Sequence, residues 1–249
     1  MKVVFSEAFY PCYVEDAAAV EGRMESIVGV IRDKVIFIDA EPALEKDILA
    51  VHSQDHVDRV KRRGLYEIAS LAAGGAVQTA MIGLGEPAFG LIRPPGHHAS
   101  EFVSWGYCYF NNMAIAVTKL KNEGLIDTCL ILDIDLHYGD GTVNILGDKD
   151  WVEIHNPAGR TRENYLKDVE KSLLNFQADM IGISAGFDNH KRDWGGLLET
   201  QDYKTIGEMV RETCRQSGSA YFALLEGGYA KKVLGYNVEA LIDGMEQEL

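Results

Sequence analysis

The sequence CLILDIDLH at residues 129–137 joins a continuous apolar run to a set of alternating polar residues. A short apolar run of this kind is typical of a strand that is buried on both faces, as in a parallel sheet. Asp133, Asp135 and His137 then recur at every second position. While the backbone stays extended, side chains at this spacing share one face of the strand. We therefore predict a buried strand that delivers two carboxylates and an imidazole to its carboxyl end.

Similar apolar runs alternate with longer helical patterns over the rest of the chain. This alternation is typical of an α/β fold in which a parallel sheet is covered by helices. The other predicted strands lie at residues 3–5, 35–38, 89–92, 180–184 and 221–225. The predicted helices lie near residues 15–32, 65–82, 112–123, 162–176, 201–216 and 237–248. Because the 249 residues contain no internal repeat or Pro/Ser-rich linker, we expect a single domain over residues 1–249.

Composition excludes several classes of protein. Hydrophobic residues make up 47% of the chain and charged residues 25%, which is ordinary for a globular protein and unlike a disordered chain. No apolar run approaches the ~20 residues that a membrane-spanning helix needs. The sequence MKVVFSEAFYPC at residues 1–12 predicts a first strand rather than a signal peptide, so we expect a cytoplasmic protein without membrane contact.

Charge and cysteine content narrow the choice of partners. The net charge of −14 argues against direct binding of nucleic acid and favours a cationic or neutral substrate, although solubility alone would explain the same charge. Cys12, Cys108, Cys129 and Cys214 are widely spaced, without a CxxC motif. We therefore expect free, buried thiols rather than disulfides.

The adjacent side chains on this strand face, Asp133, Asp135 and His137, could hold one divalent ion between two carboxylates and an imidazole. Three protein ligands leave a coordination position open for water or substrate, as at catalytic zinc. Two carboxylates also balance the charge of a divalent ion. For an isolated DxH motif a pair of strand-end caps is the alternative. Unpaired carboxylates at the end of a buried strand are energetically unfavourable, however, and this favours the metal site.

His97 and His98, in RPPGHHA at residues 93–99, form the second candidate group. The Pro-Pro-Gly turn is stiff and fixes the direction of the two imidazoles. Neighbouring histidines can divide the work of metal-assisted hydrolysis, since one can take a proton from water while the other holds positive charge near the developing oxyanion. Each needs an orienting carboxylate, for which Asp133 and Asp140 are available. A surface or capping role is the alternative for an isolated pair.

Tyr229 follows the sequence LEGG at residues 225–228. A Gly-Gly pair lets the backbone turn tightly, and the phenol that follows could donate a hydrogen bond to a polarised carbonyl oxygen. A half-buried loop aromatic is the alternative. The tandem histidines, Asp135, Asp188 and Tyr229 all follow predicted strands. Because open α/β sheets bind ligands at the carboxyl ends of their strands, we expect these side chains to converge on one site.

Five motifs together resemble the histone deacetylase superfamily, which also includes acetylpolyamine amidohydrolases and acetoin-utilisation proteins. The motifs are RPPGHHA at 93–99, GYCYFNN at 106–112, LDIDLHYGDGT at 132–142, SAGFD at 184–188 and EGGY at 226–229. They occur in the family's order, and the resemblance spans about residues 51–230. It implies an arginase-like α/β fold, a three-layer sandwich with a mostly parallel sheet and helices on both faces.

The resemblance also implies a zinc-dependent deacetylase. Asp135, His137 and Asp188 match the ligands of one zinc ion per chain, and Gly106 and Tyr107 match a loop that lines the acyl-lysine tunnel. The expected reaction hydrolyses a linear amide C–N bond. It would release an acetyl or short acyl group from an amine such as acetyl-lysine or an acetylpolyamine.

The family assigns catalytic roles to the other matching residues. The second tandem histidine is usually the general base and the first an electrostatic stabiliser, and these positions are His98 and His97 here. Asp133 and Asp140 match the carboxylates that orient the two imidazoles. Tyr229 matches the tyrosine that polarises the scissile carbonyl.

The chain also departs from the family pattern. His137-Tyr138-Gly139 stands where the family often has His-His-Gly. Members are commonly longer than this chain, so we expect shortened surface loops and a pocket that is either open or completed by a partner subunit in a homo-oligomer. The family binds potassium close to the zinc, but Glu153 stands where a serine tends to bind it, so potassium binding is left open.

Two other functions fit parts of the pattern. A two-manganese ureohydrolase of the same fold needs further carboxylates on the strand ends, and RPPGHHA and EGGY argue against it. A catalytically silent acyl-lysine-binding protein is the second alternative, although every catalytic position that can be matched is filled. The remaining histidines are expected to have structural or loop positions; they are His52, His56, His155 and His190.

Overall fold

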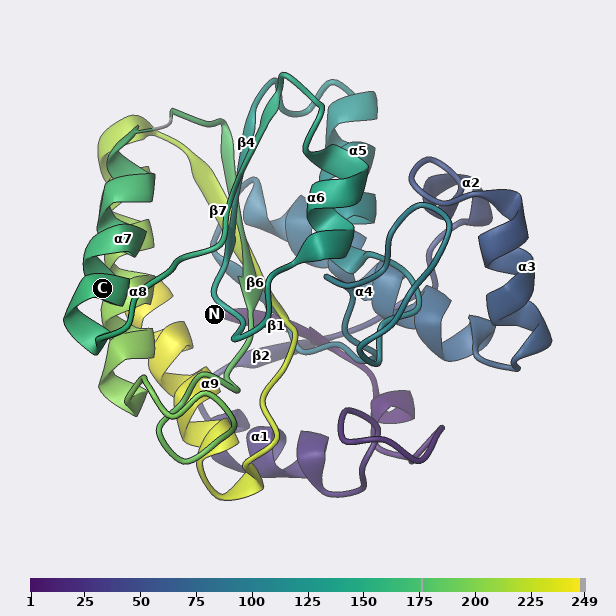
Figure 1. Cartoon of the computed structure of the whole chain (residues 1–249), viewed down its shortest axis with the longest axis horizontal. Coiled ribbons are helices and arrows are strands. Elements are labelled where there is room, and N and C mark those ends of the chain that lie inside the picture. Colours follow the sequence, from purple (N-terminus) through teal and green to yellow (C-terminus); the bar gives the residue numbers. More distant parts are fainter. Residues whose placement is uncertain (176, 247–249) are drawn as a thin grey trace.

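The structure, a computed structural model, describes residues 1–175 and 177–246. Within these ranges seven strands form one sheet, in which each pair of neighbours runs parallel (Figure 1). The sheet order is β2-β1-β3-β7-β6-β4-β5. The strands are β1 (Lys2–Phe5), β2 (Ile36–Asp39), β3 (Ala88–Gly90), β4 (Cys129–Asp133), β5 (Val152–His155), β6 (Met180–Ala185) and β7 (Ala220–Leu225). The predicted α/β class is confirmed.

Helices cover both faces of the sheet, which gives the predicted three layers (Figure 1). One face carries α1 (Arg23–Ile31), α7 (Arg162–Asn175), α8 (Thr200–Ser217) and α9 (Lys231–Met245). The other face carries α4 (Tyr66–Gly83), α5 (Asn112–Asn122) and α6 (Asp140–Leu146). Beyond α4 lie α2 (Glu45–Ile48) and α3 (Gln54–Arg62), and a 3₁₀ turn, Glu7–Phe9, follows β1.

Strand β4 shows why the polar residues gather at one edge of the sheet. Leu130, Ile131 and Leu132 have no exposed surface. Fully burying a side chain of this size contributes roughly 1.5–3 kcal/mol, so both faces of β4 are fixed by packing against helices. Asp133 at the end of β4 pairs with Ser184 of the parallel strand β6. The segments that follow β4 and β6 therefore leave the sheet at the same edge, towards the candidate site.

The prediction of a helix at residues 15–32 is wrong for residues 15–22. Residues 15–22 form bends and turns, and α1 begins only at Arg23. Gly22 has a left-handed φ of 82°, which interrupts a right-handed helix. In addition, the Arg93 guanidinium donates hydrogen bonds to the carbonyl oxygens of Ala18 and Val20, at 3.1 and 3.2 Å. A distant side chain thus binds carbonyl groups that a helix would have used.

Most other predicted elements are found, with small shifts in their ends. The prediction missed β5, whose sequence VEIH is only partly buried and lacks a continuous apolar run. It also missed α2, α3 and α6. The predicted helix at 162–176 ends in a residue outside the described ranges. The same holds for residues 247–248 of the helix predicted at 237–248, which begins already at Lys231.

The cysteines are free, and three of them are buried as predicted, namely Cys108, Cys129 and Cys214. Cys12 is exposed, which corrects the expectation that all four thiols are buried. Across the described part of the chain, none of the helices combines the length and apolar character needed to span a bilayer.

His52 is a buried structural histidine, as predicted. Its Nδ1–H donates to the carbonyl oxygen of Ser100 at 2.9 Å, and its Nε2 accepts the backbone N–H of Asn111 at 2.9 Å. The same Asn111 caps α5 by accepting the N–H of Ala114. Burial and the neighbouring His56 lower the pKa of His52 to about 3. The folded chain therefore holds this imidazole neutral at pH values where the unfolded chain binds a proton.

We expect the free energy of unfolding to fall on the acid side of neutrality because of His52. Its contribution is complete above the unfolded pKa of about 6.5 and is lost as the pH falls towards the folded pKa, with about 2 kcal/mol lost at pH 5. Urea unfolding of the wild type and His52→Gln between pH 5 and pH 8 measures this, since other titrating groups cancel in the comparison. Parallel pH profiles for the two proteins would contradict the assignment.

Candidate metal centre and active site

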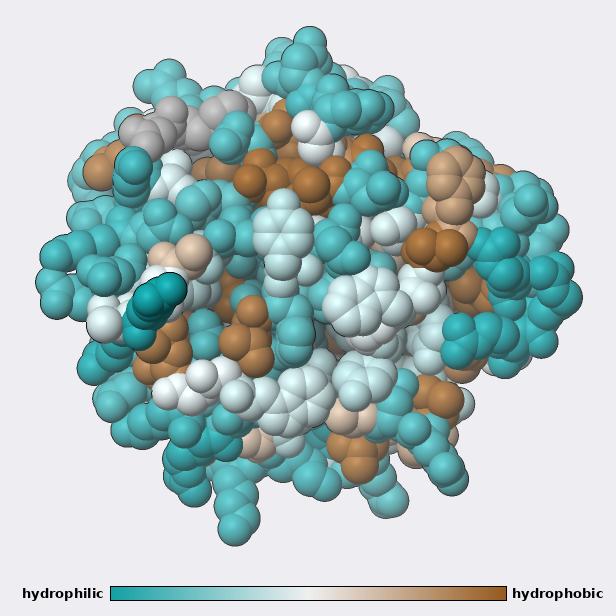
Figure 2. All heavy atoms as spheres, in the orientation of Figure 1, coloured by the Kyte–Doolittle hydropathy of each residue, from teal (hydrophilic) through white to brown (hydrophobic). Residues whose placement is uncertain are grey.

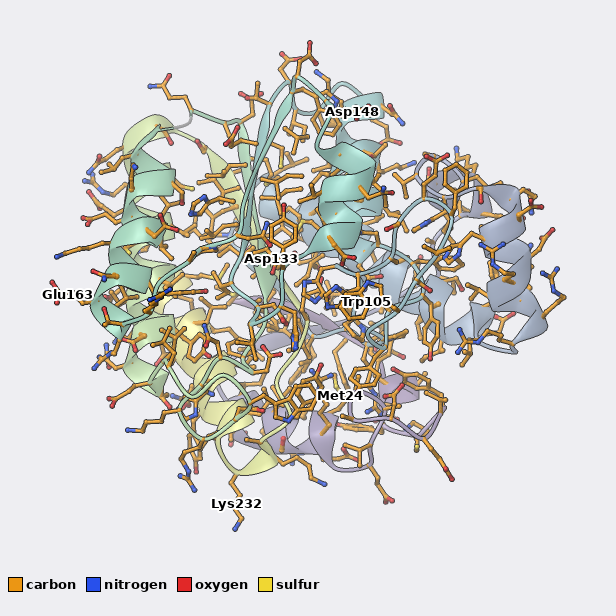
Figure 3. All side chains as sticks on the ribbon, viewed as in Figure 1. Met24, Trp105, Asp133, Asp148, Glu163 and Lys232 are labelled. Carbon is orange, nitrogen blue, oxygen red and sulfur yellow. The ribbon has the colours of Figure 1, made fainter. Side chains whose placement is uncertain are left out.

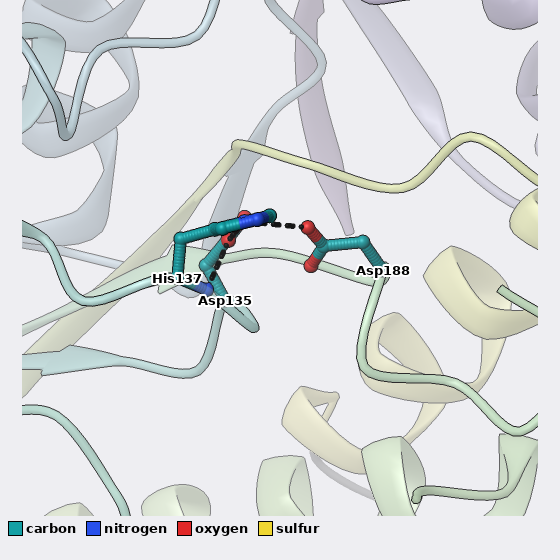
Figure 4. Close-up of side chains that lie close together, drawn as sticks. All are labelled: Asp135, His137 and Asp188. Atoms are coloured by element: carbon teal, nitrogen blue, oxygen red, sulfur yellow. Dashed lines mark hydrogen bonds and ion pairs between the residues drawn. The ribbon is translucent and has the colours of Figure 1, made fainter. Parts of the chain in front are cut away.

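Three side chains with metal-binding atoms meet beyond the ends of β4 and β6 (Figure 4). One ligand atom from each of Asp135, His137 and Asp188 lies within 4.8 Å of the other two. Nδ1 of His137 is 3.1 Å from Oδ1 of Asp135 and 3.0 Å from Oδ2 of Asp188 (Figure 4). Among the described residues, no other three histidine, cysteine or acidic side chains meet this closely. The structure thus brings together the three residues predicted as metal ligands.

The chemistry of this set fits a divalent cation. Oδ2 of Asp188 is buried and, although Nδ1 of His137 lies 3.0 Å away, it accepts no hydrogen bond of good geometry from the described residues. Burial, and then the charge of Asp135, raise the pKa of Asp188 to about 7. Two buried carboxylates repel each other, and a cation between them would remove that repulsion. Two carboxylates and an imidazole are also a donor set that zinc accepts.

Backbone groups hold both carboxylates in place. Asp135 accepts the N–H of His137 at 2.9 Å through Oδ1 and the N–H of Gly227 at 2.8 Å through Oδ2. Asp188 accepts the N–H of Leu136 at 3.0 Å through Oδ1. A Cβ atom on Gly227 would lie 2.5 Å from Oδ2 of Asp135 and 2.9 Å from Oδ2 of Asp188. Glycine is therefore required where the segment after β7 passes close to the two carboxylates.

Asp133 does not join the metal set, although the alternating pattern placed it on the same strand face. Strand β4 ends at Asp133, and the chain then turns. One carboxylate oxygen of Asp133 accepts the N–H of Asp135 at 3.2 Å, and the other lies 3.0 Å from Nδ1 of His97. Asp133 therefore orients a histidine, as the sequence comparison implied.

The tandem histidines lie side by side and each contacts one carboxylate. His97 and His98 are each 3% exposed, and their ring centroids are 4.0 Å apart. Nδ1 of His97 is 3.0 Å from Oδ2 of Asp133, and Nδ1 of His98 is 2.6 Å from Oδ1 of Asp140. These are the two pairings expected from the sequence.

The surroundings shift the pKa values of His97 and His98 in opposite directions. Burial opposes the charged form of His97, but Asp133 and Asp135 outweigh it and hold the pKa of His97 well above its usual value. For His98, burial and the neighbouring charge of His97 lower the pKa to about 4. These surroundings therefore favour the charged form of His97 and the neutral form of His98. A pair whose environments drive the pKa values apart is suited to separate electrostatic and acid–base roles.

A pocket of about 280 Å³ opens onto these groups. Its lining residues are mostly rings: Pro95, His97, His98, Trp105, Gly106, Tyr107, His137, Trp194, Gly227 and Tyr229. Trp105 lies near the middle of the view in Figure 3, where Figure 2 shows pale residues of intermediate hydropathy. Burial raises the pKa of the Tyr229 phenol well above its usual value, so its hydroxyl stays protonated. The pocket therefore combines an apolar wall with a hydroxyl donor.

Gly106 and Tyr107 form one wall of the pocket in an uncommon backbone conformation. Their φ angles are 57° and 68°, and the left-handed region is rarely adopted by a non-glycine residue such as Tyr107. A Cβ atom on Gly106 would lie 2.3 Å from Cδ2 of His98. The glycine therefore lets this loop pass close to the His98 ring. The ring of Tyr107 faces that of Tyr229, with centroids 6.0 Å apart.

Three pocket or near-pocket residues were given no role from the sequence. Glu226 is buried, and its Oε2 accepts the backbone N–H groups of Gly96 and His97 at 2.7 and 3.2 Å. Trp105 stacks on His98, and Trp194 stacks on Tyr229 with ring centroids 4.1 Å apart. Glu226 lies in the EGGY motif and Trp105 directly precedes GYCYFNN, so position alone could have indicated a role for them. Trp194 lies six residues after SAGFD and outside every motif.

The remaining histidines have the structural positions that were expected. Nε2 of His56 lies 2.7 Å from the carbonyl oxygen of Tyr109. Nε2 of His155 lies 3.0 Å from Oδ2 of Asp168. His190 is buried and accepts the N–H of Arg192.

The chain is similar to known proteins in sequence and in structure. The family model of the histone deacetylase domain matches residues 14–157 and 147–245. A probable deacetylase of Archaeoglobus fulgidus is 30% identical over 88% of this chain and 74% of its own length. The acetylpolyamine amidohydrolase of Mycoplana ramosa is 31% identical over 73% of this chain and 64% of its own. The crystal structure of the HDA15 HD domain superposes with a TM-score of 0.85 at 22% identity, covering 97% of this chain and 88% of that one.

Proposed function

Because the chain belongs to the histone deacetylase family, we propose that it is a zinc-dependent deacetylase that removes an acetyl or short acyl group from an amine. Its relatives support a hydrolase that acts on amide bonds. One observation carries the proposal. One pocket is lined by His137 of the metal-binding set, by the protonated Tyr229, and by His97 and His98, whose surroundings favour different protonation states.

Asp135, His137 and Asp188 would hold one zinc ion per chain. When bound, zinc supplies a Lewis acid that polarises the amide carbonyl and makes a nearby water more acidic. The protein residues then provide the remaining chemistry. The potassium site of the family stays a prediction, and Glu153, at the position in question, is exposed.

The proton transfers fall to His98. Its neutral imidazole, held by Asp140, accepts a proton from the attacking water and then gives a proton to the leaving amine. His97 remains a cation and stabilises the negative charge that develops on the carbonyl oxygen. The Tyr229 hydroxyl group donates a hydrogen bond to the same oxygen. Water and the amide are consumed, and a carboxylic acid and a free amine are released.

Gly106→Ala should lower the deacetylase rate by about 10²-fold, because misplacing a reacting group by about 1 Å has an effect of this size. The new Cβ atom would push against the His98 ring. Zinc content should be unchanged, since no metal ligand moves. Gly64→Ala is the matched control, because Gly64 has a φ of 70° with no described atom within 4 Å of the added Cβ. Equal rates for the two variants, measured as acetate release, would contradict the contact.

The substrate we propose is a small acylated amine or an acyl-lysine residue. The net charge of −14 favours a cationic amine, and the apolar rings of the pocket suit an aliphatic acyl-amine arm. The relatives named as acetylpolyamine amidohydrolases support the same class. We further propose one catalytic domain with shortened loops and a cytoplasmic site of action, which the four free cysteines support. Direct binding of nucleic acid is not expected, and a homo-oligomer would complete the pocket rim.

The two rival functions are less well supported. A two-manganese ureohydrolase needs a second set of carboxylates, whereas the described residues contain one group that could hold a metal. A silent acyl-lysine binder would not need two neighbouring histidines whose pKa values are shifted in opposite directions.

A substrate panel tests the proposal. Zinc-loaded and manganese-loaded protein would be assayed for acetate release from an acetyl-lysine peptide and an acetylated polyamine, and for urea release from arginine. We expect acetate with zinc. Urea release with manganese would favour the ureohydrolase, and tight acetyl-lysine binding without turnover would favour the silent binder.

A further inference from the structure

Trp105 completes a closed set of contacts around the His98–Asp140 pair. Its indole N–H donates to Oδ2 of Asp140 at 2.9 Å, while Oδ1 of the same carboxylate lies 2.6 Å from Nδ1 of His98. The Trp105 and His98 rings also stack, with centroids 3.9 Å apart and planes inclined by 32°. Each of the three side chains therefore contacts the other two.

The two histidine-orienting carboxylates differ in how they are held. The Asp133 side chain has no exposed surface, and its second oxygen accepts the backbone N–H of Asp135. The Asp140 side chain is 44% exposed, and its second oxygen accepts the Trp105 indole instead. A solvent-exposed carboxylate can rotate and bind water unless a donor fixes its second oxygen. The Trp105 indole thus fixes the second oxygen of Asp140, as the backbone N–H of Asp135 fixes the second oxygen of Asp133.

Core packing does not explain the position of Trp105. The residue is 54% exposed, so much of its surface gains nothing from burial. Its fixed contacts are the carboxylate of Asp140 and the face of the His98 imidazole, on a loop whose next residue, Gly106, closes against the same imidazole.

We propose that Trp105 is a positioning residue, which fixes the Asp140 carboxylate and through it the His98 imidazole. The assignment rests on the proposed function, in which His98 transfers protons. It is distinct from a role as a pocket wall, because a wall needs the ring of Trp105 but not its N–H group.

Trp105→Phe separates the two roles, because phenylalanine keeps a ring and lacks the donor. We expect kcat for acetate release to fall about tenfold, the effect of losing a hydrogen bond to a charged group, with KM changed less than about twofold. In an Asp140→Ala background the same substitution should have no further effect on kcat, since the shared partner is gone. A rise in KM alone, or an equal loss of kcat in both backgrounds, would overturn the proposal.

Trp194→Phe is the matched control. Trp194 is 53% exposed, lines the same pocket and stacks on Tyr229, but its indole N–H has no hydrogen bond within the described ranges. Whatever change Trp194→Phe makes to kcat should be the same with and without Asp140→Ala. Coupling of Trp194 to Asp140 as strong as that of Trp105 would show that the cycle reports general disturbance of the pocket, and would overturn the proposal.

A measurement without turnover keeps this proposal separate from the proposed function. The indole N–H resonance of Trp105, identified by its loss in Trp105→Phe, should shift in Asp140→Ala. NMR relaxation of the His98 ring should show greater mobility in Trp105→Phe than in the wild type or in Trp194→Phe. If the wild type releases no acetate, the proposed function fails while these spectra still decide on Trp105. An unshifted indole resonance or an equally ordered His98 ring would overturn the positioning role.

Discussion

Asp188→Asn should abolish zinc binding and deacetylase activity together. The substitution keeps the shape of the side chain but removes one of the two carboxylates of the metal set. Loss of the ion removes several kcal/mol of transition-state stabilisation, which corresponds to about 10³-fold or more in rate. Metal analysis of the purified protein and acetate release from an acetylated amine measure the two effects.

The stability of the same variant gives a second readout. In the metal-free wild type, the buried Oδ2 of Asp188 accepts no hydrogen bond of good geometry from the described residues and lies close to the charge of Asp135. Metal-free Asp188→Asn should therefore be at least as stable as the metal-free wild type. Zinc at 100 times its dissociation constant should stabilise the wild type by about 2.7 kcal/mol and leave the variant unchanged. Asp168→Asn, which affects the separate His155–Asp168 pair, is the control that should behave as wild type towards zinc.

If the Asp188→Asn variant still binds zinc, the metal site must lie elsewhere. Zinc-dependent stabilisation of the variant equal to that of the wild type would have the same meaning. Loss of activity with unchanged zinc content would make Asp188 a catalytic residue rather than a ligand.

His98→Ala should keep zinc and lose turnover. His98 is buried beside the metal set but is not one of its members, so the ion should bind with unchanged stoichiometry. Removing a positioned general acid–base group lowers the rate by about 10²–10⁴-fold. The loss should appear in kcat, because the imidazole acts on protons that move during the reaction rather than on substrate binding. Zinc content and steady-state kinetics of one preparation provide the measurement.

His155→Ala is the control for this variant. His155 lies outside the pocket and pairs with Asp168, so its removal should leave kcat near the wild-type value. Near-normal turnover in His98→Ala would transfer the base role to another group. Parallel loss of zinc would mean that His98 supports the metal set directly.

The convergence of the candidate ligands could be predicted from the sequence because each motif is local and the topology of a parallel sheet brings the motifs together. The run at 129–134 predicts β4, and the polar residues directly after it had to emerge at the end of that strand. A parallel sheet then brings the end of β6, with Asp188, to the same edge as Asp135 and His137. No pairing beyond the strand order was needed to place these three side chains together.

The features that the sequence did not predict depend on contacts between distant segments. Residues 15–22 have a helical pattern, but the Arg93 side chain binds the carbonyl oxygens of Ala18 and Val20. The local sequence around residues 15–22 does not indicate this contact. Trp105 is unremarkable as a residue beside a motif, and its role depends on where α6 places Asp140.

We propose that one metal ion at Asp135, His137 and Asp188 supports amide hydrolysis in the adjoining pocket. The most direct test of this proposal is a titration of metal-free protein with zinc while acetate release from an acetyl-lysine peptide and an acetylated polyamine is followed. We expect no acetate without metal and a rate that rises to a plateau at one zinc per chain. Acetate release that is independent of added zinc, or no release from either substrate at full zinc occupancy, would contradict it.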